Sequence, residues 1–236
     1  MLRPQVGSEC RTRGRFAAAI TPDPAPVVLV TGFDAFGGDA INPSWLLAQA
    51  LHRRSIAGHR VVAAQLPTVF GDALTALDGL LHQHRPVLVI CLGLASGRAA
   101  LSLERIAINI NDARIADNRG AWPIDTAVVA GGPAAYFSSL PIKAMLLALR
   151  KAGVAAEVSQ TAGTFVCNHV FYGLMHALAK RRALKGTRGG FIHVPLLPQQ
   201  GTPSMPLNDM LRGLRTAIRC ALRTTGDVSV GAGASH

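Results

Sequence analysis

The sequence has little charge and lacks any long apolar run. Charged residues make up 16% of the 236 residues and hydrophobic residues 49%, a balance that excludes an intrinsically disordered chain and requires no disulfide or metal staple. No apolar run approaches the roughly 18–20 residues that span a bilayer. The apolar patch 16–20 is too short for the core of a secretory signal. We therefore expect a soluble, cytoplasmic protein that does not enter a membrane.

Closely spaced cysteine pairs and nucleotide-binding motifs are also missing. The glycine-rich turn 32–38 matches neither the GxGxxG pattern nor a P-loop. The four cysteines are far apart, which indicates free thiols in a reducing compartment rather than a disulfide framework; they are Cys10, Cys91, Cys167 and Cys220. Cys167, His169 and His176 share one expected helix, but the histidines are seven apart and no carboxylate is near. We expect no metal and no cofactor.

Acidic residues are scarce, with 13 against 24 basic residues and a net charge of +11. Much of the excess lies between Lys180 and Arg223, where the last expected helix places arginines at helical spacing: Arg212, Arg215, Arg219 and Arg223. A solvated face of an amphipathic helix is the favoured interpretation, and a surface for nucleic acid or another anion is the alternative. Because no RNA- or DNA-binding signature accompanies the charge, nucleic acid is not an expected partner.

Strand and helix patterns alternate along the chain. Strands are expected at 27–33, 60–67, 87–94, 101–110, 156–160 and 190–197, and helices at 43–55, 72–84, 140–152, 166–182 and 206–223. The alternation predicts a single α/β domain over 26–223, a three-layer sandwich with a twisted, largely parallel open sheet flanked by helices. The polar segment 111–133 reads as a long ordered loop. Residues 1–25 and 224–236 are expected to be flexible tails.

Three residues suggest nucleophilic chemistry. Cys167 falls near the start of an expected helix, where free N–H groups and the helix dipole would lower the pKa of its thiol. His193 lies in an apolar strand and Glu104 in an apolar run, so each requires a polar partner. Together they could form a Cys–His–acid triad. Each residue also has an ordinary structural explanation, so the residues alone indicate an α/β enzyme, with a thiol enzyme as one option.

Several separated motifs follow one another in the order of a known family. They are VTGFDAFGG at 30–38, GLASGR at 93–98 leading into LSLERIAIN at 101–109, TAGTFVCNH at 161–169, and GFIHVP at 190–195. On these motifs the chain resembles pyroglutamyl peptidase I, a family of cysteine peptidases, over about 27–222. The resemblance implies an open-sheet α/β fold and removal of an N-terminal pyroglutamyl residue from peptides through an acyl-thioenzyme, without metal or cofactor. It also implies a homo-oligomer, a dimer or tetramer.

The resemblance assigns roles to individual residues. Cys167 would be the nucleophile, His193 the general base and acid, and Glu104 the carboxylate that orients the imidazole. Arg114 would lie near the cysteine and polarise the scissile carbonyl, or pair with a nearby aspartate. Leu94 stands where some members carry glutamine. The residues expected to line the pocket for the uncharged ring are Phe33, Phe36, Ile115, Phe165 and Val166.

Two other function classes compete with the peptidase hypothesis. A transferase on a similar sheet, such as a nucleoside phosphorylase, would require phosphate for turnover. A non-catalytic module for anionic partners would use the arginine-rich helix, and its binding would weaken with salt.

Overall fold

A seven-stranded sheet forms the middle layer of the molecule, with strand order β2-β3-β1-β4-β9-β5-β8. The computed structural model describes Met1 and residues 25–233. The strands are β1 (Val27–Phe33), β2 (Ser55–Ile56), β3 (His59–Leu66), β4 (Leu88–Leu94), β5 (Leu101–Glu104), β8 (Ala156–Ser159) and β9 (Arg188–Val194). Residues 2–24 of the expected N-terminal extension, and 234–236, lie outside the described residues.

The sheet is mostly parallel, as predicted, with its edges reversed. Strands β3, β1, β4 and β9 run parallel to one another. Strand β5 pairs antiparallel with β9 and parallel with β8, and β2 forms an antiparallel hairpin with β3. The functional residues therefore do not all lie beyond carboxyl ends at a single sheet edge, as a purely parallel sheet would require. Glu104 reaches the site along a strand that runs back from that edge.

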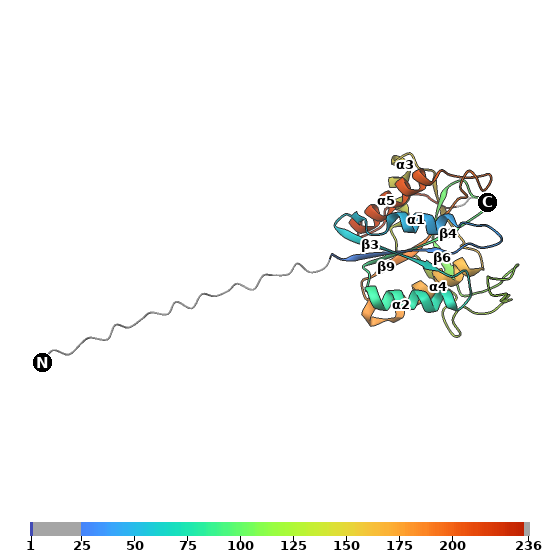
Figure 1. The fold of residues 1–236 in the computed structure, drawn as a ribbon, viewed down its shortest axis with the longest axis horizontal. Coiled ribbons are helices and arrows are strands. Elements are labelled where there is room, and N and C mark those ends of the chain that lie inside the picture. Colours follow the sequence, from blue (N-terminus) through green and yellow to red (C-terminus); the bar gives the residue numbers. More distant parts are fainter. Residues whose placement is uncertain (2–24, 234–236) are drawn as a thin grey trace.

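Helices cover both faces of the sheet and complete the predicted three layers (Figure 1). On one face lie α1 (Pro43–Leu51), α3 (Ile142–Lys151) and α5 (Leu207–Arg223), which share one apolar cluster with the sheet. On the other lie α2 (Asp72–His84) and α4 (Val166–Lys180), with a second cluster that includes three fully buried aromatic side chains, Phe171, Tyr172 and Phe191. A short 3₁₀ helix, Arg182–Leu184, follows α4.

The turn from β1 into α1 is fixed by side-chain capping. The Asn42 side chain accepts a hydrogen bond from the backbone N–H of Ser44, and Pro43 occupies the first helical position, both favourable at a helix start. Gly32 lets β1 approach this turn, because a Cβ there would lie 2.4 Å from the Ser44 carbonyl oxygen. The helix ends at Leu51, not at 55, since the chain turns through Arg53 at φ 61° into the β2–β3 hairpin.

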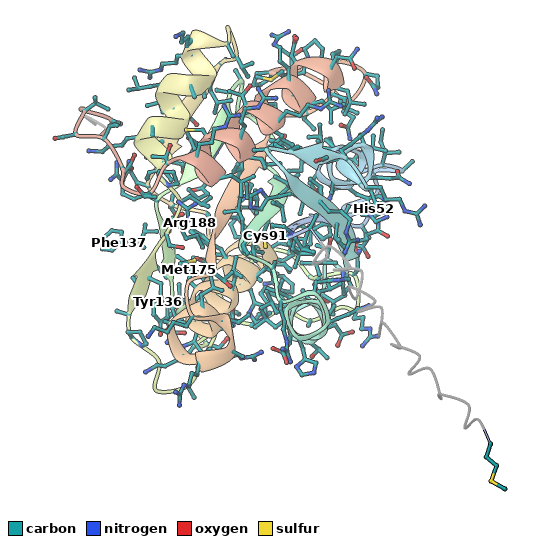
Figure 2. All side chains as sticks on the ribbon, turned by 90° about the vertical axis from the view of Figure 1, so that its left-hand side faces the viewer. His52, Cys91, Tyr136, Phe137, Met175 and Arg188 are labelled. Atoms are coloured by element: carbon teal, nitrogen blue, oxygen red, sulfur yellow. The ribbon has the colours of Figure 1, made fainter. Side chains whose placement is uncertain are left out.

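The strand predicted over 101–110 is wrong as a single element. It breaks at Arg105 into β5 and β6 (Ile106–Ile108), and β6 pairs antiparallel with β7 (Ala135–Phe137) in a separate two-stranded sheet. Arg105 is the residue that interrupts the apolar alternation in the sequence. Phe137 projects outward from this hairpin with 69% of its surface exposed, whereas Cys91 of β4 lies in the interior (Figure 2).

The described part of the expected C-terminal tail, 224–233, contacts the domain. The Asp227 carboxylate accepts hydrogen bonds from the backbone N–H groups of Lys143 and Ala144 in the first turn of α3, where a negative charge is favourable. Arg105 donates to the carbonyl of Ala232. Among residues 25–233, no helix has the length and apolar character needed to cross a membrane.

Candidate active site

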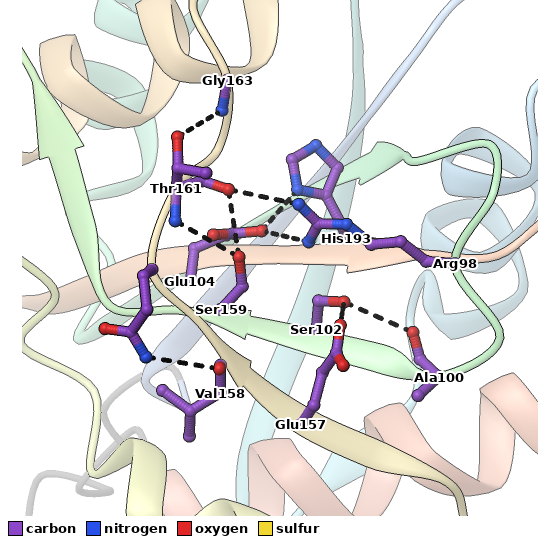
Figure 3. A network of polar contacts seen from close by, with 11 residues as sticks. Arg98, Ala100, Ser102, Glu104, Glu157, Val158, Ser159, Thr161, Gly163 and His193 are labelled. Atoms are coloured by element: carbon purple, nitrogen blue, oxygen red, sulfur yellow. Dashed lines mark hydrogen bonds and ion pairs between the residues drawn. The ribbon is translucent and has the colours of Figure 1, made fainter. Parts of the chain in front are cut away.

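His193 and Glu104 meet across the antiparallel pair β9–β5. The register places Ser102 opposite His193, which leaves the Glu104 carboxylate within reach of the ring. The imidazole Nδ1 lies 2.7 Å from Glu104 Oε1, and both side chains are buried, Glu104 completely (Figure 3). Each of these polar residues in an apolar strand therefore supplies the partner that the other requires.

A third residue, Arg98, completes this pair and is absent from the sequence prediction. Its Nη1 lies 2.8 Å from the same Glu104 Oε1. A fully buried carboxylate needs a cation or several hydrogen bonds to stay ionised. That requirement is the signal that could have found Arg98, because it lies six residues before Glu104 in the motif 93–98.

The contacts of Glu104 fix the tautomer of His193. Because Oε1 accepts a hydrogen bond from a permanently charged guanidinium, it acts as a carboxylate oxygen toward the ring. His193 Nδ1 then carries the proton and donates a hydrogen bond to Glu104. In this tautomer the lone pair lies on Nε2, and none of the described residues is hydrogen-bonded to that atom. In this tautomer, His193 Nε2 is able to accept a proton from a nearby group.

Cys167 is the second residue of α4 and lies beside this base. A Cβ on Gly93 would lie 2.8 Å from Cys167 Sγ, so the sulfur rests against the backbone of β4. Gly93 pairs with His193 in the β4–β9 ladder, which makes the thiol and the imidazole neighbours across one strand. No hydrogen bond joins them within the described part of the chain, and such contacts commonly tighten only when substrate binds.

The expected lowering of the Cys167 pKa is wrong. Burial raises the pKa of this thiol to about 12, the Glu104 charge acts in the same direction, and the Arg98 charge opposes both. Burial is the largest cause and outweighs the Arg98 charge, because a thiolate loses much of its stabilisation with its hydration. The thiol is therefore protonated at neutral pH and requires a base.

An apolar cavity of about 310 Å³ opens beside Cys167. Four of the predicted pocket residues line it, namely Phe33, Phe36, Phe165 and Val166, together with Gly37, Asp39, Ile41, Asn42, Thr68, Leu94, Ser96 and Cys167. The Phe36 and Phe165 rings lie 5.2 Å apart between centroids. The other two predicted residues, Ile115 and Arg114, are exposed and do not belong to this lining.

Two polar residues of the cavity lining, Asn42 and Thr68, already form hydrogen bonds within the protein. Asn42 caps α1 through its Oδ1 and donates to the Asp34 carbonyl, and Thr68 donates its hydroxyl to Asp34 Oδ1 at 2.6 Å. Leu94 presents an apolar side chain to the cavity. Asp39, an exposed residue, is the charged side chain of this lining, and the apolar walls suit a small, largely apolar group.

The histidines of α4 near Cys167 have structural partners. His169 Nε2 accepts from the Gly71 backbone N–H at 3.1 Å, and its Nδ1 lies 2.9 Å from Asn111 Oδ1. Burial lowers the pKa of His169 to about 4, so the ring is neutral. His176 Nδ1 pairs with the Tyr136 hydroxyl at 3.0 Å. Within residues 25–233, no group of three or more His, Cys, Asp or Glu side chains is arranged to hold a metal ion.

Known proteins share this chain's sequence and fold. A family model described as pyroglutamyl peptidase matches residues 27–224. A pyrrolidone-carboxylate peptidase from Cupriavidus taiwanensis is 58% identical over 217 residues, covering 89% of this chain and all of that protein. A pyrrolidone-carboxylate peptidase 1 from Ralstonia nicotianae is 56% identical, covering 89% of this chain and all of that protein.

Two solved structures of pyroglutamyl peptidases share the fold of this chain. The crystal structure of pyroglutamyl peptidase I from Bacillus amyloliquefaciens superposes with a TM-score of 0.85 at 42% identity, covering 88% of this chain and 100% of the other. Pyrrolidone carboxyl peptidase from Thermococcus litoralis gives 0.84 at 34% identity, covering 87% and 99%. The match over residues 27–224 and the identity to these relatives show that this chain belongs to the pyroglutamyl peptidase family of cysteine-type hydrolases.

Proposed function

We propose that the protein removes an N-terminal pyroglutamyl residue from peptides through an acyl-thioenzyme, using Cys167, His193 and Glu104 as a triad. Membership in the pyroglutamyl peptidase family supports the reaction. One observation supports the residue assignment: His193, held by Glu104 at 2.7 Å, pairs with Gly93, and the Cys167 thiol that rests against Gly93 lines an apolar cavity.

His193 activates the nucleophile in this proposal. Since the Cys167 thiol has a pKa of about 12, it cannot act as a preformed thiolate at neutral pH. His193 Nε2 removes the S–H proton as the sulfur attacks the pyroglutamyl carbonyl carbon. Glu104 accepts the Nδ1–H bond throughout and stabilises the imidazolium that forms.

Formation of the acyl-enzyme follows from this first proton transfer. The new C–S bond pushes the carbonyl electrons onto oxygen. The first intrahelical bond of α4 runs from His169 N to Phe165 O, so the N–H groups of Val166, Cys167 and Asn168 are not used by the helix ladder. They are the candidate donors for this oxyanion. Collapse breaks the C–N bond, and the imidazolium gives its proton to the leaving amine.

Hydrolysis of the thioester by water completes the cycle, with His193 again acting first as a base and then as an acid. His193 Nε2 takes a proton from a water molecule that attacks the thioester carbonyl, the C–S bond breaks, and the proton returns to the sulfur. Free pyroglutamate and the resting thiol are the products. The route uses only these side chains, backbone donors and water, consistent with an enzyme without a cofactor.

The cavity supports specificity for the lactam ring. Pyroglutamyl is small and uncharged, and the aromatic walls of Phe33, Phe36 and Phe165 bury its apolar edge. Ile115 and Arg114 do not line this cavity, so their part in substrate binding stays a prediction. The proposal retains two further expectations, a cytoplasmic location and a homo-oligomeric state. Free thiols at Cys91, Cys167 and Cys220 support the former.

The test is release of a fluorescent amine from a pyroglutamyl amide, with the prolyl and glutamyl amides as controls. We expect turnover of the pyroglutamyl amide alone. Cys167→Ala removes the nucleophile and should reduce turnover to background. Cys220→Ala is the matched control because this thiol lies on α5, across the sheet from the cavity, and it should leave turnover unchanged.

Two outcomes would contradict the proposal. Equal turnover of the prolyl amide would mean that the cavity does not recognise the lactam carbonyl. Full activity in a folded Cys167→Ala variant would mean that another group attacks the substrate. A requirement for phosphate would instead support a transferase, and salt-sensitive binding of polyanions without turnover would support a binding module.

A further inference from the structure

Arg98 links the two halves of the site. Its Nη1 donates to Glu104 Oε1 at 2.8 Å, and its Nη2 donates to the carbonyl of Thr161 at 3.2 Å (Figure 3). Thr161 opens the segment that runs from β8 to Cys167, and its carbonyl also accepts from the Ser159 hydroxyl. One guanidinium therefore spans from the strand that carries the carboxylate to the segment that leads into the nucleophile.

The burial of Glu104 makes this cation necessary. The Glu104 side chain has no exposed surface, and its Oε2 has no hydrogen-bond partner among the described residues. Within residues 25–233 the hydrogen-bond partners of this carboxylate, the His193 ring and Arg98, both contact Oε1. A buried carboxylate that loses its cation becomes protonated or loses its fixed geometry, since ionisation without compensation is costly.

The charge of Arg98 also reaches the nucleophile. It lowers the pKa of the Cys167 thiol, against the raising effects of burial and of Glu104. The Cys91 thiol also acts on the sulfur, and burial raises its own pKa to about 12. The Asp39 carboxylate lines the same cavity as the sulfur. The nearby acid on β8, Glu157, is occupied by a 2.6 Å hydrogen bond from Ser102.

We propose that Arg98 is a positioning residue for the reaction, which holds Glu104 in place as the hydrogen-bond acceptor for His193 and ties it to the segment that leads to Cys167. This inference rests on the proposed function. It assigns Arg98 two separable roles, a charge that any cation could supply and a planar fork that only arginine fits.

Three variants separate these roles through the pH profile of kcat/KM for the pyroglutamyl amide. In Arg98→Gln the charge is lost, so the site binds a proton more readily. We expect the acid limb to move up by about one pH unit and kcat/KM at pH 7 to fall about 10- to 100-fold. In Arg98→Lys the charge is kept, so the acid limb of the kcat/KM profile should stay at its wild-type pH. Because lysine cannot form the same two contacts, kcat should lie between those of Arg98→Gln and the wild type.

Arg105→Gln is the matched control. This arginine directly follows Glu104 in the chain, yet its guanidinium donates to the carbonyl of Ala232, away from the pair. We expect the pH limb and kcat of this variant to match the wild type. Thermal unfolding of each variant separates loss of fold from loss of function. If Arg98→Gln does not fold, Arg98→Lys still tests the fork, through a loss of kcat at an unchanged acid limb.

A second measurement does not depend on turnover. The rate at which iodoacetamide alkylates Cys167 is followed from pH 6 to 10 by peptide mass spectrometry. It should fall in Arg98→Gln relative to wild type and Arg105→Gln, because the thiol loses a stabilising charge. An unmoved acid limb together with unchanged alkylation would overturn the inference. Absence of wild-type turnover would overturn the proposed function, and the alkylation comparison would still decide the role of Arg98.

Discussion

At the scale of single residues, the proposed mechanism starts from a protonated Cys167 thiol rather than from a preformed thiolate. Burial raises the pKa of Cys167 to about 12, so deprotonation has to be coupled to the attack. His193 is suited to this because Glu104 fixes its Nδ1 proton and leaves Nε2 as the base. A thiol kept neutral until substrate arrives is also a poor target for oxidants, which react with the thiolate.

Glu104→Gln tests the orienting carboxylate. The amide would still fill the space, but it loses the negative charge and can offer an N–H toward either His193 or Arg98. We expect kcat to fall by about 10²- to 10⁴-fold with KM little changed, because the imidazolium loses its stabilisation only during reaction. Steady-state kinetics on the pyroglutamyl amide measures this. A loss as complete as that of Cys167→Ala in a folded protein would contradict a purely orienting role.

At the scale of elements, Gly93 of β4 sets how closely α4 approaches the sheet. A Cβ at this position would lie 2.8 Å from Cys167 Sγ and 2.8 Å from Phe191 Cζ. Both neighbours belong to the packed interior between β4, β9 and α4. The Cys167 sulfur can therefore lie this close to β4 only because Gly93 has no side chain.

Gly93→Ala should therefore damage the site more than the fold. The added methyl group displaces the sulfur and the Phe191 ring, at a cost of about 1–3 kcal/mol in unfolding free energy. We expect kcat/KM to fall at least tenfold. Gly79→Ala is the control, because a Cβ at this position of α2 meets nothing within 4 Å and improves helix propensity. Urea unfolding measures the change in unfolding free energy, and steady-state kinetics measures the change in kcat/KM. Unchanged activity in Gly93→Ala would contradict the close packing.

Helix α4 also carries a pH-dependent element of stability in His169. Burial lowers the pKa of this ring to about 4, whereas an unfolded chain has about 6.5. The unfolded state therefore binds the proton first, and stability is lost as pH falls from 6.5 toward 4. By linkage the loss between pH 7 and 4.5 is about 2–3 kcal/mol.

His169→Gln should remove this part of the pH dependence. We expect urea midpoints of the variant to change less than those of the wild type between pH 7 and 4.5. His82→Gln, at an exposed position of α2, serves as the control because it leaves the His169 contacts intact. If wild type and His169→Gln lose stability in parallel, the buried neutral ring is not the cause.

At the scale of the whole molecule, the excess positive charge lies apart from the chemistry. The exposed arginines of α5, Arg212, Arg215, Arg219 and Arg223, lie on the helical layer shared with α1 and α3. Cys167 packs against the opposite layer. Only Arg212 has an acidic partner on the helix, Asp209 at 3.0 Å and exposed, which contributes little to stability.

We predict that the chain forms a homo-oligomer, and the segment after β6 offers apolar surface for it. Ile115, Trp122, Ile124 and Phe137 each expose more than half of their surface, and large exposed apolar side chains are suited to contacts between subunits. Light scattering should give a mass above that of one chain, and Ile124→Asp should lower it. Lys143→Asp, on α3, is the control for added charge. A monomeric wild type at micromolar concentration would contradict the prediction.

The sequence predicted the features that local patterns encode. Strand and helix patterns predicted the strands of the main sheet and the helix that begins at Pro43, because both depend on neighbouring residues. Polar residues in apolar strands indicated that Glu104 and His193 need partners. The sequence did not predict Arg98 as a site residue, because its contact with Glu104 depends on the path of the loop between β4 and β5. The thiol pKa was wrong because the degree of burial depends on how α4 packs against Gly93, which no local pattern reveals.

The most direct test of this account is affinity labelling with a pyroglutamyl chloromethyl ketone, whose ring should enter the cavity and whose carbon alkylates the adjacent nucleophile. Peptide mass spectrometry locates the label, and the prolyl analogue is the control. We predict one label on Cys167, slowed by excess pyroglutamyl amide and absent in Cys167→Ala. Labelling of another residue, or equal labelling by the prolyl analogue, would contradict the claim that Cys167 attacks a pyroglutamyl group held in this cavity.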